Sequence, residues 1–432
     1  MIRQCTDNEL ERKKFLYGLL AAFLFVGAVL AHSAPGQEIP ADDREWREMQ
    51  PAAKKMAARS AKPGSHVTLF MTGDIMTGRG IDQALPFAGD PVIYEPYMKS
   101  AKGYLRIAEE TNGPIPQPAA FSYIWGDALE ELQRRRPNLR LINLETSITA
   151  SNDFWKGKGI NYRMHPKNIP VLTQAGINLC ALANNHILDW GYTGLLETLQ
   201  TLQKANIASS GAGRNLSEAA APAVMPLAGK GRVIVFSLGL ASSGIPSSWA
   251  ADADKPGVHL LTDLSDGTVR QFAQDVRRIK HQGDIAVASI HWGGNWGYQI
   301  TGAQKAFAHR LIDEADVDVI HGHSSHHVKG IEVYKERLIL YGCGDFINDY
   351  EGIGGYEEFR ADLSLMYFAT IDPATGKLNE LQMIPTQIKR FRVNRASMND
   401  ARWLKNILNR EGAGLGTQVI LDKNNALIMR WD

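Results

Sequence analysis

The sequence predicts an α/β fold with a large, buried sheet. Seven short apolar runs, many rich in β-branched residues and each bounded by turn residues, are typical of buried strands. These runs are 66–74, 139–145, 177–186, 232–240, 284–293, 316–323 and 337–346. Segments with apolar residues three to four positions apart, typical of helices, lie at 192–205, 268–283 and 302–315. Strands and helices in alternation predict an α/β domain.

The pattern changes after about residue 360. Two apolar runs flank the turn sequence DPATGK at 372–377, and they predict an antiparallel strand pair. This pair would form an edge of the sheet or a second sheet packed on the first. The segment 396–432 has the pattern of a helix followed by one or two strands. We therefore predict a main domain over 63–395 and a C-terminal extension, 396–432, packed on it.

The N-terminal segment predicts export. Basic residues at 12–14 precede an apolar run at 15–31, which is slightly long for a signal peptide and slightly short for a membrane-spanning helix. Residues 1–34 are therefore expected to be a cleaved signal peptide or an N-terminal membrane anchor, followed by a linker at 35–62. Either way, we expect the domain in the periplasm or at the outer face of the cytoplasmic membrane.

Composition excludes several classes of protein. The 432 residues include 47 basic and 46 acidic side chains, a net charge of +1, so nothing favours nucleic acid as a partner. Of three cysteines, Cys180 and Cys343 lie in apolar runs, where buried free thiols are expected. The chain has no G-x-S-x-G motif and no Gly-rich phosphate-binding loop after a strand, which argues against a serine hydrolase and an ATP-dependent ligase.

Polar residues follow the predicted strands where each strand ends. In open α/β sheets, binding sites gather at the carboxyl ends of the strands. A single Asp there is more often a turn or cap residue, and a single His is more often a buried structural residue. Together, however, they form the mixture of ligands that a borderline divalent metal prefers. The candidates are Asp74, Glu145, Asn185, His186, Asp189, His291, His323 and His326.

Four histidines crowd into the sequence HGHSSHH at 321–327. His323 and His326 suit a ligand loop, because Gly322 gives the backbone freedom at the strand end. His321 lies on the apolar run itself, so we expect a structural or supporting role for it. His327 follows His326 directly, and the sequence pattern assigns it no role of its own.

Five motifs in order resemble the CapA family of poly-gamma-glutamate capsule synthesis proteins, within the calcineurin-like metallophosphatase superfamily. They are FMTGDIMTGRG, INLETSIT, GINLCALANNHILDWGYTGLLETLQTL, SIHWGGNWG and IHGHSSHHVKGIEVYKERLILYGCGDF, and the resemblance spans about 66–392. It implies a four-layer α/β/β/α sandwich of two packed mixed sheets flanked by helices. It also implies one or two divalent ions per chain (Mn, Zn or Fe), an anionic polymer or small-molecule substrate, and membrane-bound capsule synthesis machinery as a partner.

The resemblance assigns roles motif by motif. Asp74 matches the aspartate of the first metal motif, and Glu145 stands where the superfamily has a metal-bridging aspartate. Asn185 matches a metal-binding asparagine and His186 the histidine that acts as a general acid. The later histidine ligands match His291, His323 and His326.

Two positions depart from the superfamily pattern. Met76 occupies the place of the histidine in the first motif, which removes one expected nitrogen ligand. The acidic residue that normally follows the motif histidine comes three positions later, as Asp189. It would still orient His186 if the intervening turn is helical, since residues three apart share a face.

Two further residues are candidates for substrate binding. Arg79 follows the first motif and would hold a carboxylate or phosphate, or else lie on the surface. Trp292, with Trp125 and Trp296, would wall the cleft or pack in the core. The Ser-rich segment 241–250 would form a lid or a plain connection. Three functions stay open: a capsule-polymer synthesis or export protein, a metal-dependent hydrolase of phosphoester or amide bonds, and a polymer-binding module with a vestigial metal site.

Overall fold

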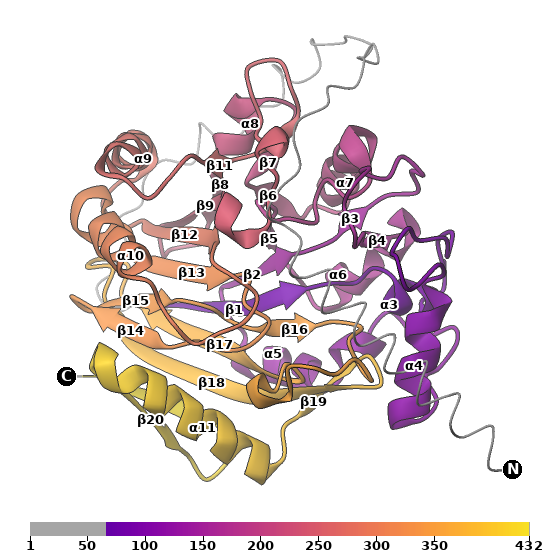
Figure 1. The fold of residues 1–432 in the computed structure, drawn as a ribbon. Helices are drawn as coiled ribbons and strands as arrows, with labels where there is room; N and C mark the ends of the chain where they lie inside the picture. The colour runs from indigo at the N-terminus through magenta and orange to yellow at the C-terminus, as the bar shows by residue number, and fades with distance from the viewer. Residues whose placement is uncertain (1–65, 432) are drawn as a thin grey trace, which may run out of the picture.

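The computed structural model describes residues 66–431, and the predicted leader and linker at 1–34 and 35–62 lie outside them. Two large sheets form the centre of the molecule (Figure 1). The first sheet has the order β20-β21-β18-β17-β1-β2-β5-β6, with β16 beside β1 and β19 beside β18. Its strands are β1 (Val67–Ile75), β2 (Leu139–Leu144), β5 (Leu179–Ala181), β6 (Ala208–Ser210), β16 (Asp345–Ile347), β17 (Leu363–Ile371), β18 (Leu378–Lys389), β19 (Arg392–Arg395), β20 (Thr417–Leu421) and β21 (Leu427–Trp431).

The second sheet has the order β11-β9-β12-β13-β15-β14, with β8 beside β9. Its strands are β8 (Ala223–Pro226), β9 (Arg232–Leu240), β11 (Leu260–Leu261), β12 (Ile285–His291), β13 (Val319–His323), β14 (Ile331–Tyr334) and β15 (Arg337–Leu340). Two small pairs complete the strands: β3 (Ser147–Ile148) with β4 (Arg163–Met164), and β7 (Ala212–Gly213) with β10 (Gly257–Val258).

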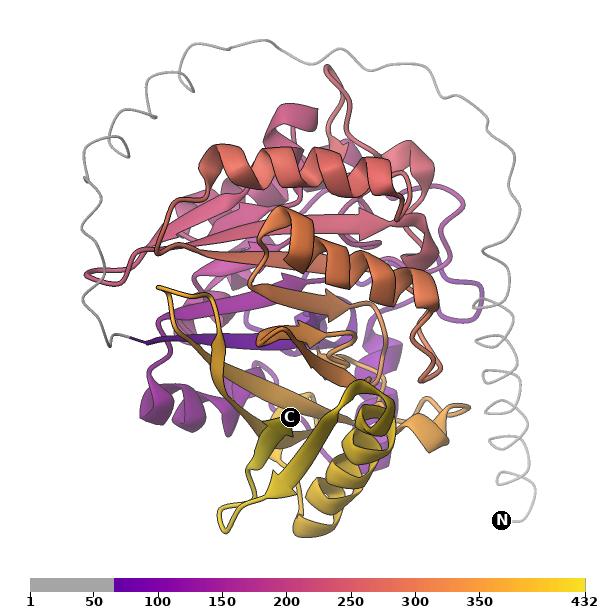
Figure 2. The same ribbon diagram turned by 90° about the vertical axis from the view of Figure 1, so that its left-hand side faces the viewer.

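Helices cover both outer faces of the sheets (Figures 1 and 2). They are α3 (Gly80–Ala84), α4 (Lys102–Asn112), α5 (Ala128–Arg135), α6 (Pro170–Gln174), α7 (Gly191–Lys204), α8 (Leu216–Ala220), α9 (Asp266–Ile279), α10 (Gly302–Ala315) and α11 (Met398–Gly412). Local sequence fixes where several of them begin. For example, Thr301 and Gln304 form a reciprocal capping box at the start of α10.

Three apolar cores separate the layers, and the alternation of side chains along the strands assigns residues to them. On β1, Leu69 and Met71 pack between the two sheets, whereas Phe70 faces the opposite way, toward the helices over the first sheet. A third core lies between the second sheet and helices α9 and α10. The predicted α/β/β/α sandwich of two mixed sheets flanked by helices is confirmed.

The predicted strand at 337–346 is wrong, because the chain changes sheet within it. β15 ends at Leu340, and the chain turns through Gly344, which has a φ of 75°, before β16 joins the first sheet beside β1. A Cβ atom on Gly73 would lie 1.6 Å from the carbonyl oxygen of Gly344, so only glycine allows this approach. The predicted strand at 177–186 is also shorter than expected, since β5 ends at Ala181 and a loop follows.

The C-terminal part extends the first sheet. The antiparallel pair β17–β18 is present as expected, and β21 pairs with β18. Leu404 and Leu408 of α11 pack into the core between the sheets. Cys180 and Cys343 are buried free thiols. Within residues 66–431, no helix combines the length and the apolar character needed to cross a membrane.

Candidate metal centre

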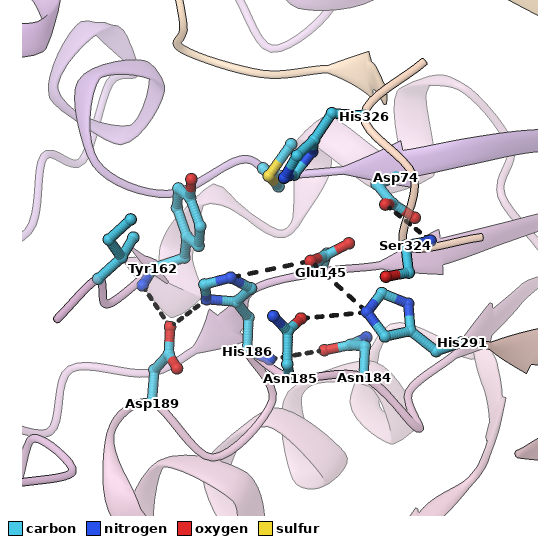
Figure 3. A network of polar contacts seen from close by, with 12 residues as sticks. Asp74, Glu145, Tyr162, Asn184, Asn185, His186, Asp189, His291, Ser324 and His326 are labelled. Carbon is cyan, nitrogen blue, oxygen red and sulfur yellow. Dashed lines mark hydrogen bonds and ion pairs between the residues drawn. The ribbon is translucent and has the colours of Figure 1, made fainter. Parts of the chain in front are cut away.

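The ends of five strands meet at one edge of the sandwich. β1 and β2 run parallel in the first sheet, and β12 and β13 run parallel in the second. Their ends place Asp74, Glu145 and His291 together (Figure 3), and His323 at the end of β13 belongs to the same cluster. β16 begins with Asp345, which pairs in register with Asp74. The convergence expected from the strand-end residues is therefore present in the structure.

Two groups of ligand atoms share one carboxylate. Asp74, His291 and His323 form the first group, and in each group the ligand atoms all lie within 4.8 Å of one another. The second group consists of Asp74, His326 and Asp345. All five residues are buried. Oxygen and nitrogen ligands in this proportion suit Mn, Zn or Fe, and a shared carboxylate allows two ions side by side.

Asp345 was not among the ligands predicted from the sequence. Its two carboxylate oxygens lie 2.9 and 3.1 Å from the Nδ1 atom of His326, and Asn348 donates to one of them. The sequence carries a signal, since Asp345 lies near the end of the apolar run 337–346, but that run predicts a single strand. The crossing of the chain back to the first sheet is what brings Asp345 next to Asp74.

A chain of hydrogen bonds defines which nitrogen of His323 faces the site. The Nε2 atom of His321 lies 2.7 Å from the carbonyl oxygen of Thr72, so it carries a proton and its Nδ1 atom accepts from the hydroxyl of Ser289 at 3.0 Å. The oxygen of Ser289 then accepts from the Nε2 atom of His323 at 2.9 Å. The Nδ1 atom of His323 is left with an unshared lone pair. His321 thus supports a ligand, the structural role expected for it.

His291 completes an arrangement that calls for a cation. Its Nδ1 atom lies 2.8 Å from the Nδ1 atom of His323, and its Nε2 atom lies 3.1 Å from the Oδ1 atom of Asn185. A neutral imidazole carries one proton, so His291 can donate in only one of these two contacts. In the remaining contact, two acceptor atoms face each other. A cation resolves the conflict. Two nitrogen atoms this close together would both be available to hold one ion.

Buried negative charge at the same point favours a cation as well. Burial, together with the nearby Asp345, raises the pKa of Asp74 to about 7. Burial and the nearby Asp74 raise the pKa of Glu145 well above its ordinary value. The amide of Asn143 donates to both carboxylates, at 2.7 Å to Asp74 and 3.2 Å to Glu145. The residues present therefore fit a divalent metal.

Glu145 and Asn185, which the resemblance also assigns as ligands, lie beside the first group without belonging to it. The Oε1 atom of Glu145 is 3.9 Å from the Nε2 atom of His291 and 3.8 Å from that of His186. Asn184 supports the loop, because its amide donates to the carbonyl of Leu144 and its oxygen accepts from the backbone of His186. Figure 3 shows these residues along one side of the site.

His186 is held on its outer side by two residues. Its Nδ1 atom lies 2.7 Å from Asp189 and 3.0 Å from the Nζ atom of Lys158. Lys158 also forms an ion pair with Asp189 at 2.6 Å, and the backbone of Tyr162 donates to Asp189 at 2.6 Å. The contact expected between Asp189 and His186 is thus present. Burial lowers the pKa of His186 to about 4, which keeps the ring neutral.

Lys158 is a residue that sequence reasoning missed. It lies in an irregular loop between β3 and β4, with no neighbouring apolar run or motif to draw attention to it. Its ammonium group contacts Asp189, the carbonyl oxygen of Ile160 and His186, and it lies 5.7 Å from the centre of the Trp249 ring.

Met76, in place of the motif histidine, is fully buried. Its sulfur accepts a hydrogen bond from the hydroxyl of Tyr350 at 3.4 Å. The second group of ligands nevertheless has a histidine, since His326 approaches from the loop after β13.

Both expectations for Arg79 are wrong. Its guanidinium is buried and pairs with Glu95 at 2.9 Å and with Asp349 at 2.5 Å. It also lies 3.8 Å above the ring of Tyr104. With two carboxylates already bound, it is neither a surface arginine nor available to a substrate anion.

Trp292 does not wall the cleft. Its indole N–H donates to the carbonyl of Tyr341 at 3.0 Å, and its ring packs in the core under α9 and α10. Trp125 is also fully buried, whereas Trp296 is half-buried and packs against the ring of His326 at 5.2 Å. Of the three tryptophans, Trp296 is therefore the one beside the site.

The segment 241–250 is a packed connection, not a lid. It forms two 3-10 turns, and Trp249 in the second turn is fully buried. The hydroxyl of Ser242 accepts from the backbone of Gly293 at 3.1 Å, which ties the segment to the strand end that carries His291.

Fold and site together define an α/β/β/α sandwich of two mixed sheets, with a candidate metal centre at its strand ends. Residues 68–350 match the family model described as bacterial capsule synthesis protein PGA_cap, and the chain belongs to this family. It is 49% identical over 362 residues to a probable polyglutamine synthesis accessory protein of Mycobacterium tuberculosis, covering 84% of this chain and 95% of the relative.

Two further relatives are more distant. The chain is 24% identical to the capsule biosynthesis protein CapA of Bacillus anthracis, covering 66% of this chain and 60% of that protein. It is 30% identical to the PGA biosynthesis protein CapA of Bacillus subtilis, covering 48% of this chain and 52% of that protein.

Proposed function

We propose that this chain is an exported accessory protein of capsule-polymer synthesis that hydrolyses a bond of the polymer, or of a precursor, at a divalent metal centre. The observation that carries the proposal is the pair of buried ligand groups that share Asp74. Family membership and the names of its relatives support the polymer pathway. The basic and apolar N-terminal segment supports export, to the periplasm or the outer face of the cytoplasmic membrane.

A bound divalent ion would supply a water of lowered pKa and would polarise the bond under attack. Asp74, His291 and His323 would hold one such ion, and Asp74, His326 and Asp345 a second. The alternative of a polymer-binding module with a vestigial centre is disfavoured, because both ligand groups are intact and buried.

His186 would act as the proton donor to the leaving group. Its Nε2 atom faces Glu145, while its Nδ1 atom faces Asp189 (Figure 3). The Nζ atom of Lys158 also lies beside Nδ1. When Lys158 donates to Nδ1, the ring proton resides on Nε2, where it can pass to the departing group. When Asp189 accepts from Nδ1, the Nε2 atom is free to accept a proton. The two partners thus allow both states of a neutral ring.

The first test is metal content and hydrolysis of the purified full chain. We expect one or two ions of Mn, Zn or Fe per chain by elemental analysis, reduced by His323→Ala and by Asp345→Asn. His259→Gln, which changes a histidine outside both ligand groups, should keep the content of the unmodified chain. Release of new amine or phosphate ends from glutamyl polymers or phosphoesters should stop in the two metal-site variants. Folded protein without metal would refute the proposal. Metal binding without hydrolysis would refute the hydrolase and leave polymer binding as the candidate function.

A further inference from the structure

A cavity of about 380 Å³ opens beside the second ligand group, within the size range of small-molecule sites. Asn348 and Trp296 line it, and both also touch that group: Asn348 donates to Asp345, and Trp296 packs on the ring of His326. Tyr350 lines it too and packs edge-on against His326 at 5.5 Å. A chain reacting at the metal centre would therefore extend into this cavity.

The positive charges in the cavity wall are already neutralised. Arg79 is bound by Glu95 and Asp349, as described above. Arg360 pairs with Asp362 at 2.8 Å and with Asp400 at 2.9 Å.

Lys389 is the one cation of the wall without a carboxylate partner among residues 66–431, and it is exposed. The wall also contains three carboxylates, Glu351, Glu357 and Asp362, so they balance the three cations Arg79, Arg360 and Lys389. A chain with a carboxylate on every residue would enter a cavity with no net positive charge, and its anions would lose water without gaining partners.

The remaining lining is neutral and suited to flat polar groups. Trp296, Tyr350 and Tyr356 present aromatic surface, and Asn112 and Gln387 present side-chain amides. The indole N–H of Trp296 has no hydrogen-bond partner among the described residues. That nitrogen is itself buried, so Trp296 offers a ligand in the cavity its aromatic surface and not its N–H group.

We propose that this cavity binds the uncharged, primary-amide side chains of a glutamine-type polymer and discriminates against the carboxylate side chains of a glutamate-type polymer. The inference rests on the proposed function and narrows its substrate class. Aromatic faces pack against planar amides, and neutral donors and acceptors in the wall can form hydrogen bonds with those amides. A carboxylate, in contrast, would find no unpaired, buried cation in the wall.

The test compares two oligomers of equal length and linkage, one with side-chain amides and one with side-chain carboxylates. Binding to the full chain is measured by calorimetry in the presence of a chelator, so that carboxylates gain nothing from a metal. We expect the amide oligomer to bind at least 10-fold more tightly. Tyr356→Ala should weaken its binding about 10-fold, whereas Tyr356→Phe should preserve it. Equal or tighter binding of the carboxylate oligomer, or no binding of either, would overturn the proposal.

A charge reversal supplies a second, independent measurement. Glu357 is an exposed wall residue, so Glu357→Lys should leave the fold intact and improve binding of the carboxylate oligomer several-fold. The matched control is Glu380→Lys, at an exposed position on β18 seven residues from Gln387, or about 23 Å along the strand. The control should change neither affinity, and an equal response of both variants would contradict a role for this cavity.

The same preparations, returned to metal, separate the two proposals. Metal binding and hydrolysis without a preference for amides would refute the substrate class and leave the hydrolase. A preference for amides in a chain that binds no metal would refute the hydrolase and leave the cavity.

Discussion

Replacing Asp74 by asparagine should make the metal-free protein more stable and abolish its stabilisation by metal. The carboxylate is fully buried near Asp345, and its pKa of about 7 lies well above the ordinary 3.8. Ionising it in the folded state at pH 7 therefore costs on the order of 4 kcal/mol. Asparagine removes this cost but leaves one of two donors, Asn143 or the backbone of Ser324, without its acceptor, a loss of about 1–3 kcal/mol. The net gain is about 2 kcal/mol.

The sign of the pH dependence follows from the raised pKa. Between about pH 4 and pH 7 the folded protein holds a proton on Asp74 that the unfolded chain has released, so the stability of the metal-free protein falls as pH rises through this window. The advantage of Asp74→Asn should thus be absent near pH 4 and complete near pH 7.

Urea unfolding of the full chain, with chelator or with Mn²⁺ or Zn²⁺, measures both effects. Metal at 100 times its dissociation constant should stabilise the unmodified chain by about 2.7 kcal/mol and leave Asp74→Asn unchanged. The control is Asp82→Asn, a buried aspartate away from the site that accepts from Gly89, His165 and Asn168. It should lose stability and keep the metal response. Destabilisation of metal-free Asp74→Asn, or a retained metal response, would refute the reasoning.

Three further outcomes are expected. Lys158→Met leaves Asp189 as the partner of the Nδ1 atom of His186, so the turnover rate of metal-dependent hydrolysis should fall about 100-fold with unchanged metal content. Trp292→Ala should lower the free energy of unfolding by about 3–5 kcal/mol, since the ring lies in a packed core. Burial lowers the pKa of His259 to about 4, so folding stability is lost as pH falls from about 6.5 toward 4, and His259→Gln should reduce this loss by on the order of 2 kcal/mol.

Each of these has a result that would contradict it. Full turnover in Lys158→Met would mean that Asp189 alone sets the proton on His186. A loss in Trp292→Ala no larger than in the half-buried Trp296→Ala would argue against its place in the core. An identical acid profile in His259→Gln, followed by urea unfolding at each pH, would assign the acid sensitivity to other groups.

The strand-end residues were predictable because parallel strands of a sandwich end at one edge, and motifs marked the polar residues there. Asp345 was not predicted as a ligand, because the chain leaves one sheet for the other within a continuous apolar run and no local pattern reveals that change. The position of Trp292 in the core was predictable from the sequence. It follows His291, and neighbouring side chains along a strand point to opposite faces of the sheet. The partners of Arg79, however, include Asp349, 270 positions away, so only the folded chain brings them together.

The two ligand groups take atoms from both halves of the sandwich. In the first, Asp74 comes from the first sheet and the two histidines from the second; in the second, His326 follows the second sheet and the two aspartates belong to the first. A bound ion would therefore cross-link the two sheets, much as a disulfide joins segments that are distant in sequence. Among residues 66–431 the two cysteines are free thiols, so such an ion would supply a cross-link between the layers that no disulfide provides there. Scarcity of that metal would then slow maturation as well as catalysis.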